Sequence, residues 1–218
     1  MQPLDLYASI EEYLEFDDEI QTLYNEISNI AISKNPKTLI DIGCGQGEFC
    51  RIISSNGIKA LGVDLSEKQI EIASSKGIDT KCIDIKDINE KYDCATAVFD
   101  VVNYLPKDYI KLFLTHVYNL LNDGGYFIFD INSLYGFDEV AQGTLNIDTD
   151  DKFIAIDANF DDITLFTDIS VFSKDGNCYK KQSGTIKQYY YRIEQLENIL
   201  KSLGFEVEDV KDFKLHQY

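Results

Sequence analysis

The sequence predicts an α/β protein with a doubly wound, mostly parallel sheet and an antiparallel β insertion after the fifth strand. Three observations predict this fold class. Between residues 38 and 131, short apolar runs alternate with segments of helical hydrophobic period. From about residue 144, long β-rich segments are joined by hairpin signals, and a helical period returns after residue 192. Strands joined by helical crossovers are parallel, with right-handed connections.

The composition is typical of one folded domain, 1–218, and argues against several classes of protein. Hydrophobic residues make up 44% of the 218 residues, enough for a core, and the net charge is −18. A protein that holds nucleic acid by its phosphates needs a basic surface, so no nucleic acid partner is expected. No apolar run approaches the ~18 residues of a membrane span, and the first residues lack a secretory signal. We therefore expect a cytoplasmic protein without a membrane partner.

The side chains that often mark metal or nucleophile chemistry form no such pattern here. The five cysteines are odd in number and include no Cys-x-x-Cys pair, so they are expected to be reduced thiols packed as small apolar groups. His116 lies beside an apolar helical stripe, and His216 lies near the end of the sequence. No metal site and no Ser–His–Asp set is expected.

The first half of the chain gives the first three strands. Residues 1–34 have a helical period that Asp17 and Asp18 interrupt, which predicts an N-terminal helical cap. The first strand, Thr38–Ile42, leads into a helix from Gly47 to Ser55. A second strand, Ala60–Asp64, precedes a helix with a Ser66–Gln69 capping box, and a third strand spans Thr80–Ile85.

The remaining elements follow in the same way. A fourth strand spans Cys94–Val101, Pro106 opens a long helix, and Tyr126–Ile131 is a fifth strand. The insertion, 144–191, is expected to be an antiparallel lid. Residues 192–218 should form a final helix and an edge strand. The ranges expected to be strands in these last two parts are Phe153–Phe160, Ile163–Phe172, Cys178–Tyr191 and Phe205–Val210.

A glycine-rich loop follows the first strand, in the string Asp41-Ile-Gly-Cys-Gly-Gln-Gly47. Glycines at such a strand–helix turn let a ligand lie against bare backbone. A dinucleotide site uses Gly-x-Gly-x-x-Gly, and this chain has Glu48 in place of the third glycine. A carboxylate in the first helical turn also repels a pyrophosphate. The loop therefore disfavours NAD.

Three carboxylates complete the pattern around this loop. Asp41 lies directly before it and can meet an ammonium group, while Asp64 ends the second strand about 20 residues later, where a carboxylate takes ribose hydroxyls. Asp84 ends the third strand, where it can accept from an adenine amine while Ile85 packs on the ring. A phosphate-free adenosyl ligand with a positive amino-acid end fits this set. That ligand is S-adenosylmethionine.

These motifs, with the segment Phe99–Leu105, resemble in order and spacing those of the class I S-adenosylmethionine-dependent methyltransferases. The resemblance covers roughly residues 36–132. It implies a Rossmann-like sheet of the seven-stranded type, with 36–135 as the cofactor-binding core. In this family Leu65 flanks the adenosyl group, Gln69 stands where a methionine often lies against the adenine, and Phe99 contacts the methionine part by its backbone. The pattern and the resemblance together give the expected cofactor-binding residues: Asp41, Gly43, Cys44, Gly45, Asp64, Leu65, Gln69, Asp84, Ile85 and Phe99.

The part after residue 132 resembles small-molecule methyltransferases such as the aminosugar N,N-dimethyltransferases. The resemblance rests on Phe129-Asp-Ile-Asn132 at the fifth strand, on the antiparallel insertion, and on Gln188-Tyr-Tyr-Tyr191 before the last helix. The family usually adds a seventh, antiparallel strand, and only Lys211–Tyr218 remains to supply one here.

The methyl acceptor is expected beyond the carboxyl ends of the fourth and fifth strands. The fourth strand lacks the Asp/Asn-Pro-Pro-Tyr/Phe signature of enzymes that methylate exocyclic base amines, which argues against a DNA N-methyltransferase. Asp130 either orients an amine or caps its strand, and Tyr189 either reaches the site or packs within the sheet. The expected catalytic residues are Asn103, Tyr104, Asp130, Asn132 and Tyr189.

Other interpretations remain open at this point. The insertion carries ten carboxylates between Asp138 and Asp175, against Lys152 and Lys174, which is either a solvated face or a lid that attracts a cationic acceptor. The sequence favours methyl transfer to a small molecule, an amine among others. A methyltransferase acting on protein or RNA, and a non-catalytic S-adenosylmethionine sensor, are the alternatives. The sequence leaves the oligomeric state open.

Overall fold

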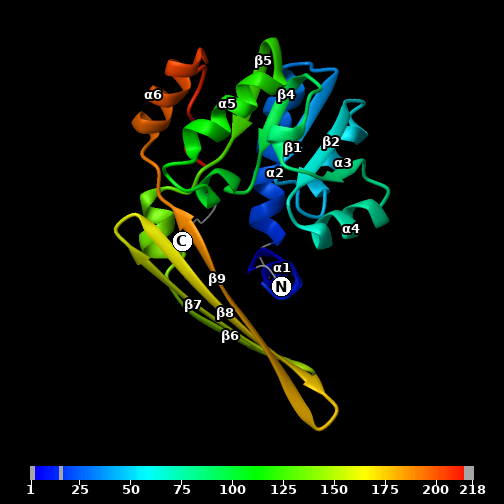
Figure 1. Cartoon of the computed structure of the whole chain (residues 1–218), viewed down its shortest axis with the longest axis vertical. Coiled ribbons are helices and arrows are strands. Elements are labelled where there is room, and N and C mark those ends of the chain that lie inside the picture. Colours follow the sequence, from blue (N-terminus) through cyan, green and yellow to red (C-terminus); the bar gives the residue numbers. More distant parts are fainter. Residues whose placement is uncertain (1–2, 15–16, 214–218) are drawn as a thin grey trace. The chain divides into compact units, whose positions relative to one another are not determined.

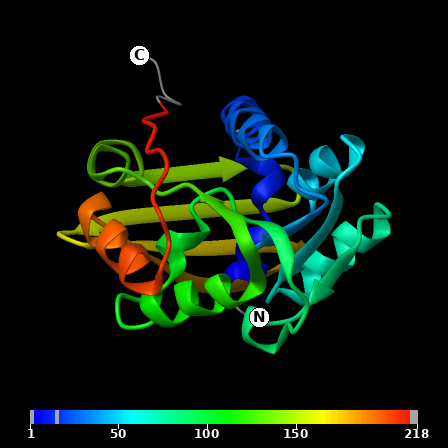
Figure 2. The same cartoon turned by 90° about the horizontal axis from the view of Figure 1, so that it is seen from above.

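The computed structural model describes residues 3–14 and 17–213 of the chain, which divides into two compact units (Figures 1 and 2). The first unit joins Met1–Glu15 to Asn132–Tyr191. The second unit joins Phe16–Ile131 to Arg192–Tyr218. Within the described residues, no helix is both long and apolar enough to cross a membrane.

The second unit contains a parallel sheet of five strands. The strand order is β3-β2-β1-β4-β5, and every neighbouring pair is parallel. The predicted fold class is confirmed by this sheet and by the antiparallel sheet of the first unit. The strands are β1 (Thr38–Ile42), β2 (Lys59–Asp64), β3 (Thr80–Cys82), β4 (Tyr92–Ala97) and β5 (Leu121–Phe129).

Five α-helices flank this sheet. Apolar side chains of α2 and α3, Leu23 and Phe49 among them, form one core cluster with Leu39 of β1, while α5 packs against β4, β5 and α6. The Ser66 hydroxyl accepts a hydrogen bond from the Gln69 backbone N–H at 3.2 Å and so caps α4. The helices are α2 (Asp17–Ser33), α3 (Glu48–Ser55), α4 (Glu67–Ser75), α5 (Ile110–Leu120) and α6 (Ile193–Leu203).

The first unit is built on an antiparallel sheet in the order β6-β7-β8-β9. One face of this sheet is buried and carries Ile154, Leu165 and Ile169, and α1 (Pro3–Ala8) packs against β9. The short turns η1 (Glu11–Tyr13) and η4 (Gly136–Val140) belong to the same unit. The strands are β6 (Gly143–Asp148), β7 (Lys152–Asp161), β8 (Thr164–Asp175) and β9 (Cys178–Tyr189).

The sequence did not predict β6 as a strand. It pairs only with β7, from Gly143 opposite Ala158 to Asp148 opposite Phe153. As an edge strand of six residues it offers only Leu145 and Ile147 as apolar positions, and Leu145 is 41% exposed. An edge strand that buries so little apolar surface has a weak alternating pattern.

The strand predicted at Phe205–Val210 is wrong, because these residues form no strand. The chain leaves α6 through Gly204, whose φ is +102°, and the Phe205 ring then packs edge-on against Tyr118, with ring centroids 5.1 Å apart. Further along, Glu208 pairs with Lys34, which directly follows α2. Side-chain contacts with α5 and with the end of α2 therefore hold this segment, in place of a backbone ladder.

Four other predicted strands end earlier than expected; one is the strand predicted at Cys178–Tyr191, since β9 ends at Tyr189. β3 stops at Cys82 because Asp84 caps the turn η2 (Ile85–Asp87), accepting from the Lys86 N–H at 3.1 Å. β4 stops at Ala97, shortly before two residues with positive φ, and β5 stops at Phe129. Likewise, α5 begins at Ile110, after a turn in which the Tyr109 N–H donates to the Pro106 carbonyl.

Candidate functional site

The glycine loop between β1 and α3 lies in the second unit and uses left-handed backbone at each of its three glycines. Gly43, Gly45 and Gly47 have φ values of +72°, +51° and +79°. The Gly43 and Cys44 N–H groups donate to the Val63 carbonyl of β2 at 2.8 and 3.1 Å. A Cβ added at Gly45 would meet nothing within 4 Å, so bare backbone faces open space there.

Asp64, at the end of β2, ties this loop to the next helix. One carboxylate oxygen accepts from the Gly45 N–H at 3.0 Å, and the other accepts from the Ser66 N–H at 2.8 Å. Because Ser66 caps α4, a single half-buried carboxylate fixes the glycine loop, the end of β2 and the start of α4. Each oxygen keeps a lone pair for a further donor.

Asp41 lies inside the unit, directly before the loop. Its side chain is buried and accepts hydrogen bonds from the Thr96 hydroxyl at 2.7 Å and from the Cys50 thiol at 3.7 Å. Burial raises the pKa of Asp41 to about 7, the two hydrogen bonds oppose this change, and the charges of Asp64 and Asp130 add to it.

Asp130 follows β5 and binds the turn that follows β4. Its two oxygens accept from the backbone N–H groups of Phe99 and Asp100 at 2.7 and 2.9 Å. Burial raises the pKa of Asp130 to about 6 against these hydrogen bonds. Phe99 and Asp100 have φ values of +67° and +54°, which costs a non-glycine residue roughly 1–2 kcal/mol each.

The three carboxylates Asp41, Asp64 and Asp130 make this edge of the sheet strongly negative. Among the residues that the structure describes, no lysine or arginine forms an ion pair with any of them. The charges of Asp64 and Asp130 raise the pKa of the buried Asp41, so a cation placed among the three carboxylates would relieve this repulsion. The site is therefore suited to a positively charged ligand.

The chain matches a family of known proteins over most of its length. Residues 11–210 match the family model described as a methyltransferase domain. The chain belongs to this family. The predicted methyltransferase family is thus confirmed, and this methyltransferase can be compared with individual relatives.

Three relatives illustrate how similar the methyltransferase is to other proteins. The protein YqeM of Bacillus subtilis (strain 168), a candidate methyltransferase, is 28% identical over 79% of this chain and 74% of its own. The structure of an S-adenosylmethionine-dependent methyltransferase from Clostridium acetobutylicum ATCC 824 is 29% identical, with a TM-score of 0.75 over 92% of this chain and 87% of that one. The structure of the sugar N-methyltransferase KedS8 from Streptoalloteichus sp. ATCC 53650 has a TM-score of 0.71 over 92% of this chain and 83% of that one. Its sequence identity is 15%, so this similarity is one of fold.

The remaining predicted cofactor residues of the methyltransferase differ in their exposure and in their hydrogen-bond partners. Asp84 is held by Lys86, whose ammonium lies 3.1 Å from the carboxylate; burial opposes ionisation, but hydrogen bonds from Lys86 outweigh it and lower the pKa of Asp84. Ile85 is buried and Leu65 is 70% exposed. Gln69 is 9% exposed, and its side-chain oxygen has no hydrogen-bond partner within the described part of the chain.

The predicted catalytic residues divide between the two units. Asp130 lies in the second unit with Asn103 and Tyr104, both in the turn η3 (Val101–Tyr104), and Asn103 is fully buried. Asn132 and Tyr189 belong to the first unit, where Tyr189 pairs with Thr164 across β8 and β9. The structure therefore brings three of the five together in the unit that holds the glycine loop.

Sequence reasoning missed two features of this site. Nothing in the sequence marked Thr96, a β4 residue, as the partner of Asp41, because strand threonines are common and its neighbour comes from another strand. Nothing predicted the left-handed pair Phe99 and Asp100 either. Because neither residue is a glycine, nothing marked a turn there, and the predicted strand Cys94–Val101 ran through it.

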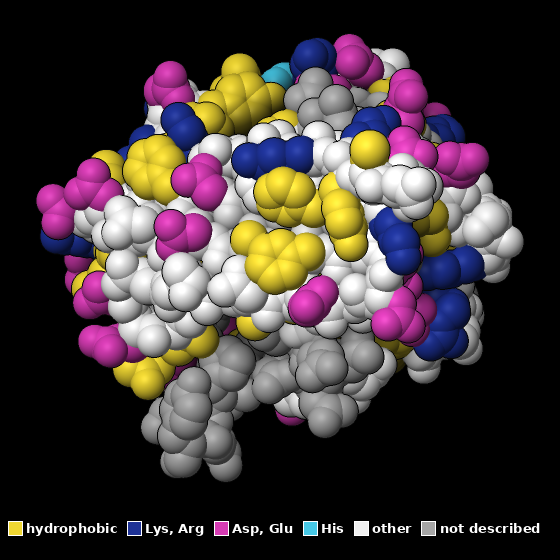
Figure 3. Space-filling model, turned by 90° about the horizontal axis from the view of Figure 1, so that it is seen from below, with side chains coloured by type: hydrophobic (Ala, Val, Ile, Leu, Met, Phe, Trp, Pro, Cys, Tyr) yellow, Lys and Arg dark blue, Asp and Glu magenta, His cyan; other side chains and the backbone are white. Residues whose placement is uncertain are grey.

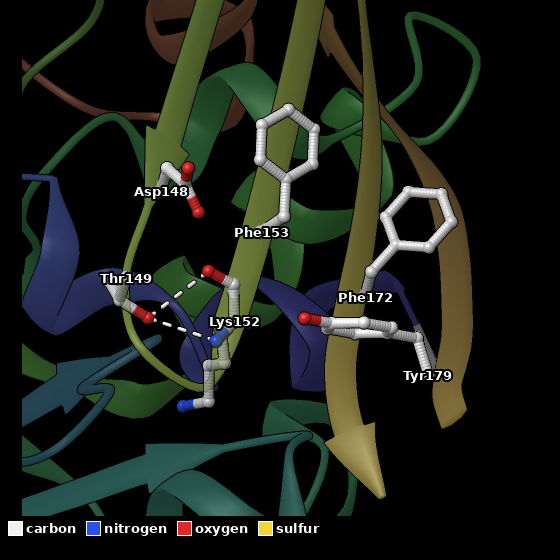
Figure 4. Close-up of a pocket in the computed structure, with 6 residues that line it drawn as sticks. All are labelled: Asp148, Thr149, Lys152, Phe153, Phe172 and Tyr179. Carbon is white, nitrogen blue, oxygen red and sulfur yellow. Dashed lines mark hydrogen bonds between the residues drawn. The ribbon is translucent and has the colours of Figure 1, made fainter. Parts of the chain in front are cut away.

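A hollow of about 330 Å³ in the first unit holds none of the predicted site residues (Figure 4). Thr149 and Lys152 form a turn there: the Thr149 hydroxyl accepts from the Lys152 N–H at 2.9 Å and donates to its carbonyl at 3.1 Å. The hollow is lined by Asp148, Thr149, Lys152, Phe153, Phe172 and Tyr179.

The ten carboxylates from Asp138 to Asp175, eight of them within 144–191, are all exposed. Asp157 and Asp168 lie opposite each other in β7 and β8, in register positions that alternate with buried residues such as Ile169, so they lie on the open face of the sheet. On the face drawn in Figure 3, hydrophobic side chains gather with Lys or Arg and Asp or Glu side chains around them. Exposure of all ten carboxylates is what a solvated acidic face requires.

Proposed function

We propose that this methyltransferase moves a methyl group from S-adenosylmethionine to a small-molecule acceptor, with an amine as the favoured acceptor class. The family match and the 29% identical S-adenosylmethionine-dependent relative support the donor. When bound, S-adenosylmethionine supplies an electrophilic methyl group on a sulfonium ion.

The observation that carries the proposal is the negative cradle formed by Asp41, Asp64 and Asp130. A sulfonium and an ammonium match these carboxylates, whereas a pyrophosphate does not. The open space at Gly45 accepts a ligand against the backbone, and Glu48, paired with Arg51 at the start of α3, keeps the helix N-terminus unsuited to phosphate.

Each residue would hold a different part of the donor. Asp64 keeps lone pairs for the ribose hydroxyls while its bonds to Gly45 and Ser66 fix its orientation. Asp41 would face the ammonium, directly or through a water. Ile85 would pack against the adenine. The side-chain oxygen of Gln69, one helical turn after Ser66, is buried and has no hydrogen-bond partner among the described residues.

An amine acceptor fits the groups beyond β4 and β5. An amine nucleophile needs only to arrive neutral and correctly placed, so catalysis rests on positioning and exclusion of water. Tyr104, which is half-buried in η3, supplies a polar group for such positioning, while Asn103 is fully buried. The sequence resemblance to aminosugar methyltransferases and the name of the sugar N-methyltransferase that shares the fold point the same way.

The test begins with calorimetry on the whole chain, using S-adenosylmethionine and S-adenosylhomocysteine. Asp64→Ala should weaken both ligands by roughly ten- to a hundred-fold, or ~1.5–3 kcal/mol, because it removes a charged acceptor that both ligands share. Glu67→Ala, a change in the first turn of α4 that leaves Asp64 in place, is the control. Unchanged affinity in Asp64→Ala would contradict the assigned cradle.

The acceptor is then sought by product analysis. The enzyme is incubated with S-adenosylmethionine and either the small-molecule fraction or the protein fraction of a cell extract, and mass spectrometry records a gain of one methylene. A gain confined to the protein fraction would favour the protein alternative. Tight binding without any released S-adenosylhomocysteine would favour the sensor.

A further inference from the structure

The turn after β4 has a backbone that its own residues do not favour. Phe99 and Asp100 are both left-handed, and neither is a glycine. Two successive N–H groups in this conformation point to one side and form a small concave site for an anion. Such a pair persists only when its surroundings hold it in place.

Asp130 is the group that holds it. The Phe99 N–H donates to one carboxylate oxygen and the Asp100 N–H donates to the other, at 2.7 and 2.9 Å. The two oxygens are thus both engaged by backbone donors. These bonds fix the orientation of the carboxylate and give it a role in the turn that needs no contact with an acceptor amine.

The held turn lies directly against the glycine loop. Val101 follows Asp100, and a Cβ added at Gly43 would lie 2.7 Å from Val101 Cγ2. Because no space separates the two segments, a shift of the turn must move Val101 against the loop. Asp130 therefore acts on the glycine loop through a continuous path of contacts.

We propose that Asp130 is a positioning residue, whose carboxylate clamps the Phe99–Val101 turn against the glycine loop and so completes the cofactor site. The inference rests on the proposed function for the identity of the ligand. It assigns Asp130 a different role from the orientation of an acceptor amine.

The first experiment compares cofactor affinity in Asp130→Asn with that of the wild-type chain. The amide keeps one acceptor oxygen but sets an NH₂ group against the second backbone N–H, so the clamp is half lost. We expect the Kd for S-adenosylmethionine to rise about tenfold, with a similar rise for S-adenosylhomocysteine. A direct role on the acceptor predicts an unchanged Kd for both, and that result would overturn the proposal.

A second variant separates the clamp from other roles of the carboxylate. Glycine adopts positive φ without strain, so Asp100→Gly makes the turn less dependent on Asp130. Asp130→Asn combined with Asp100→Gly should bind the cofactor within about threefold of Asp100→Gly alone. A double variant that keeps the full tenfold defect would contradict the clamp.

Asp93 offers a matched control, because it makes the same kind of bond at the other end of the sheet. It accepts from the N–H groups of Lys37 and Thr38 at 2.9 and 3.1 Å, at the start of β1. Asp93→Asn should lower the melting temperature and leave the cofactor Kd unchanged. An equal loss of affinity in this variant would mean that the Asp130 effect is general destabilisation.

A measurement on unsubstituted Asp130 covers the case in which Asp130→Asn does not fold. By NMR, the amide protons of Phe99 and Asp100 should lie downfield and titrate together with one midpoint. The charges of Asp41 and Asp130 interact, so the titration is repeated in Asp41→Asn to exclude coupling. Independent or absent titration would overturn the clamp, whereas wild-type protein that fails to bind S-adenosylmethionine would overturn the proposed function alone.

Discussion

Single carboxylates decide the chemistry of this site, and Asp41 shows how burial turns one of them into a pH-sensitive group. Its pKa is raised to about 7, mainly by burial. Because the folded-state pKa lies above the unfolded one, this group stabilises the folded chain fully below about pH 4, and that contribution is lost as the pH rises to about 7.

The substitution Asp41→Asn isolates this effect. The amide remains neutral and still accepts from the Thr96 hydroxyl, so the ligand-free variant should lose less stability than the wild type between about pH 5 and about pH 8. Thermal melts across this range give the comparison, and the difference includes the Asp41–Asp130 repulsion that the substitution removes. Parallel curves would show that Asp41 does not titrate in this range.

The glycine loop needs glycine for two reasons: positive φ and space for a ligand against the backbone. A pair of alanine substitutions can separate these two reasons. Gly45 and Gly57 both have positive φ, +51° and +80°, and a Cβ at either position meets nothing within 4 Å. Gly45→Ala and Gly57→Ala should therefore cost similar stability, roughly 1–2 kcal/mol each. Only the alanine at position 45 places a methyl group in the cradle.

The two variants should therefore have similar melting temperatures but different affinities for S-adenosylmethionine, measured by calorimetry. We expect Gly45→Ala to lose S-adenosylmethionine affinity by tenfold or more, because the added methyl occupies space meant for ligand. Gly57, between α3 and β2, should be neutral for binding. Equal affinities in the two variants would show that the ligand does not approach Gly45.

How far the sequence predicts each element depends on where its stabilising contacts come from. The strand β1, the glycine loop and the Ser66 cap follow from local pattern, and the structure has them as predicted. The segment after Gly204 has the composition of a strand but is held by Tyr118 and Lys34, contacts that no local pattern reveals. The roles of Thr96 and of the Phe99–Asp100 turn likewise depend on partners that are distant in the sequence, Asp41 and Asp130.

The charge of the whole molecule is the remaining property that acts on a ligand. Twenty basic residues against 38 acidic ones give −18 at pH 7. A field of this sign accelerates the approach of a cation, and salt screens it over a Debye length of about 10 Å at 0.1 M. The donor and its product differ in this respect, since S-adenosylmethionine carries one net positive charge and S-adenosylhomocysteine carries none.

Stopped-flow binding of the two compounds therefore tests the field without any knowledge of the acceptor. The association rate of S-adenosylmethionine should fall several-fold between roughly 0.02 and 0.5 M salt, while that of S-adenosylhomocysteine should change little. The neutral product is the matched control, because it shares every contact except those of the sulfonium methyl. Equal salt dependence for both compounds would mean that the acidic surface does not attract the donor and only keeps the protein solvated. This surface includes the ten exposed carboxylates from Asp138 to Asp175.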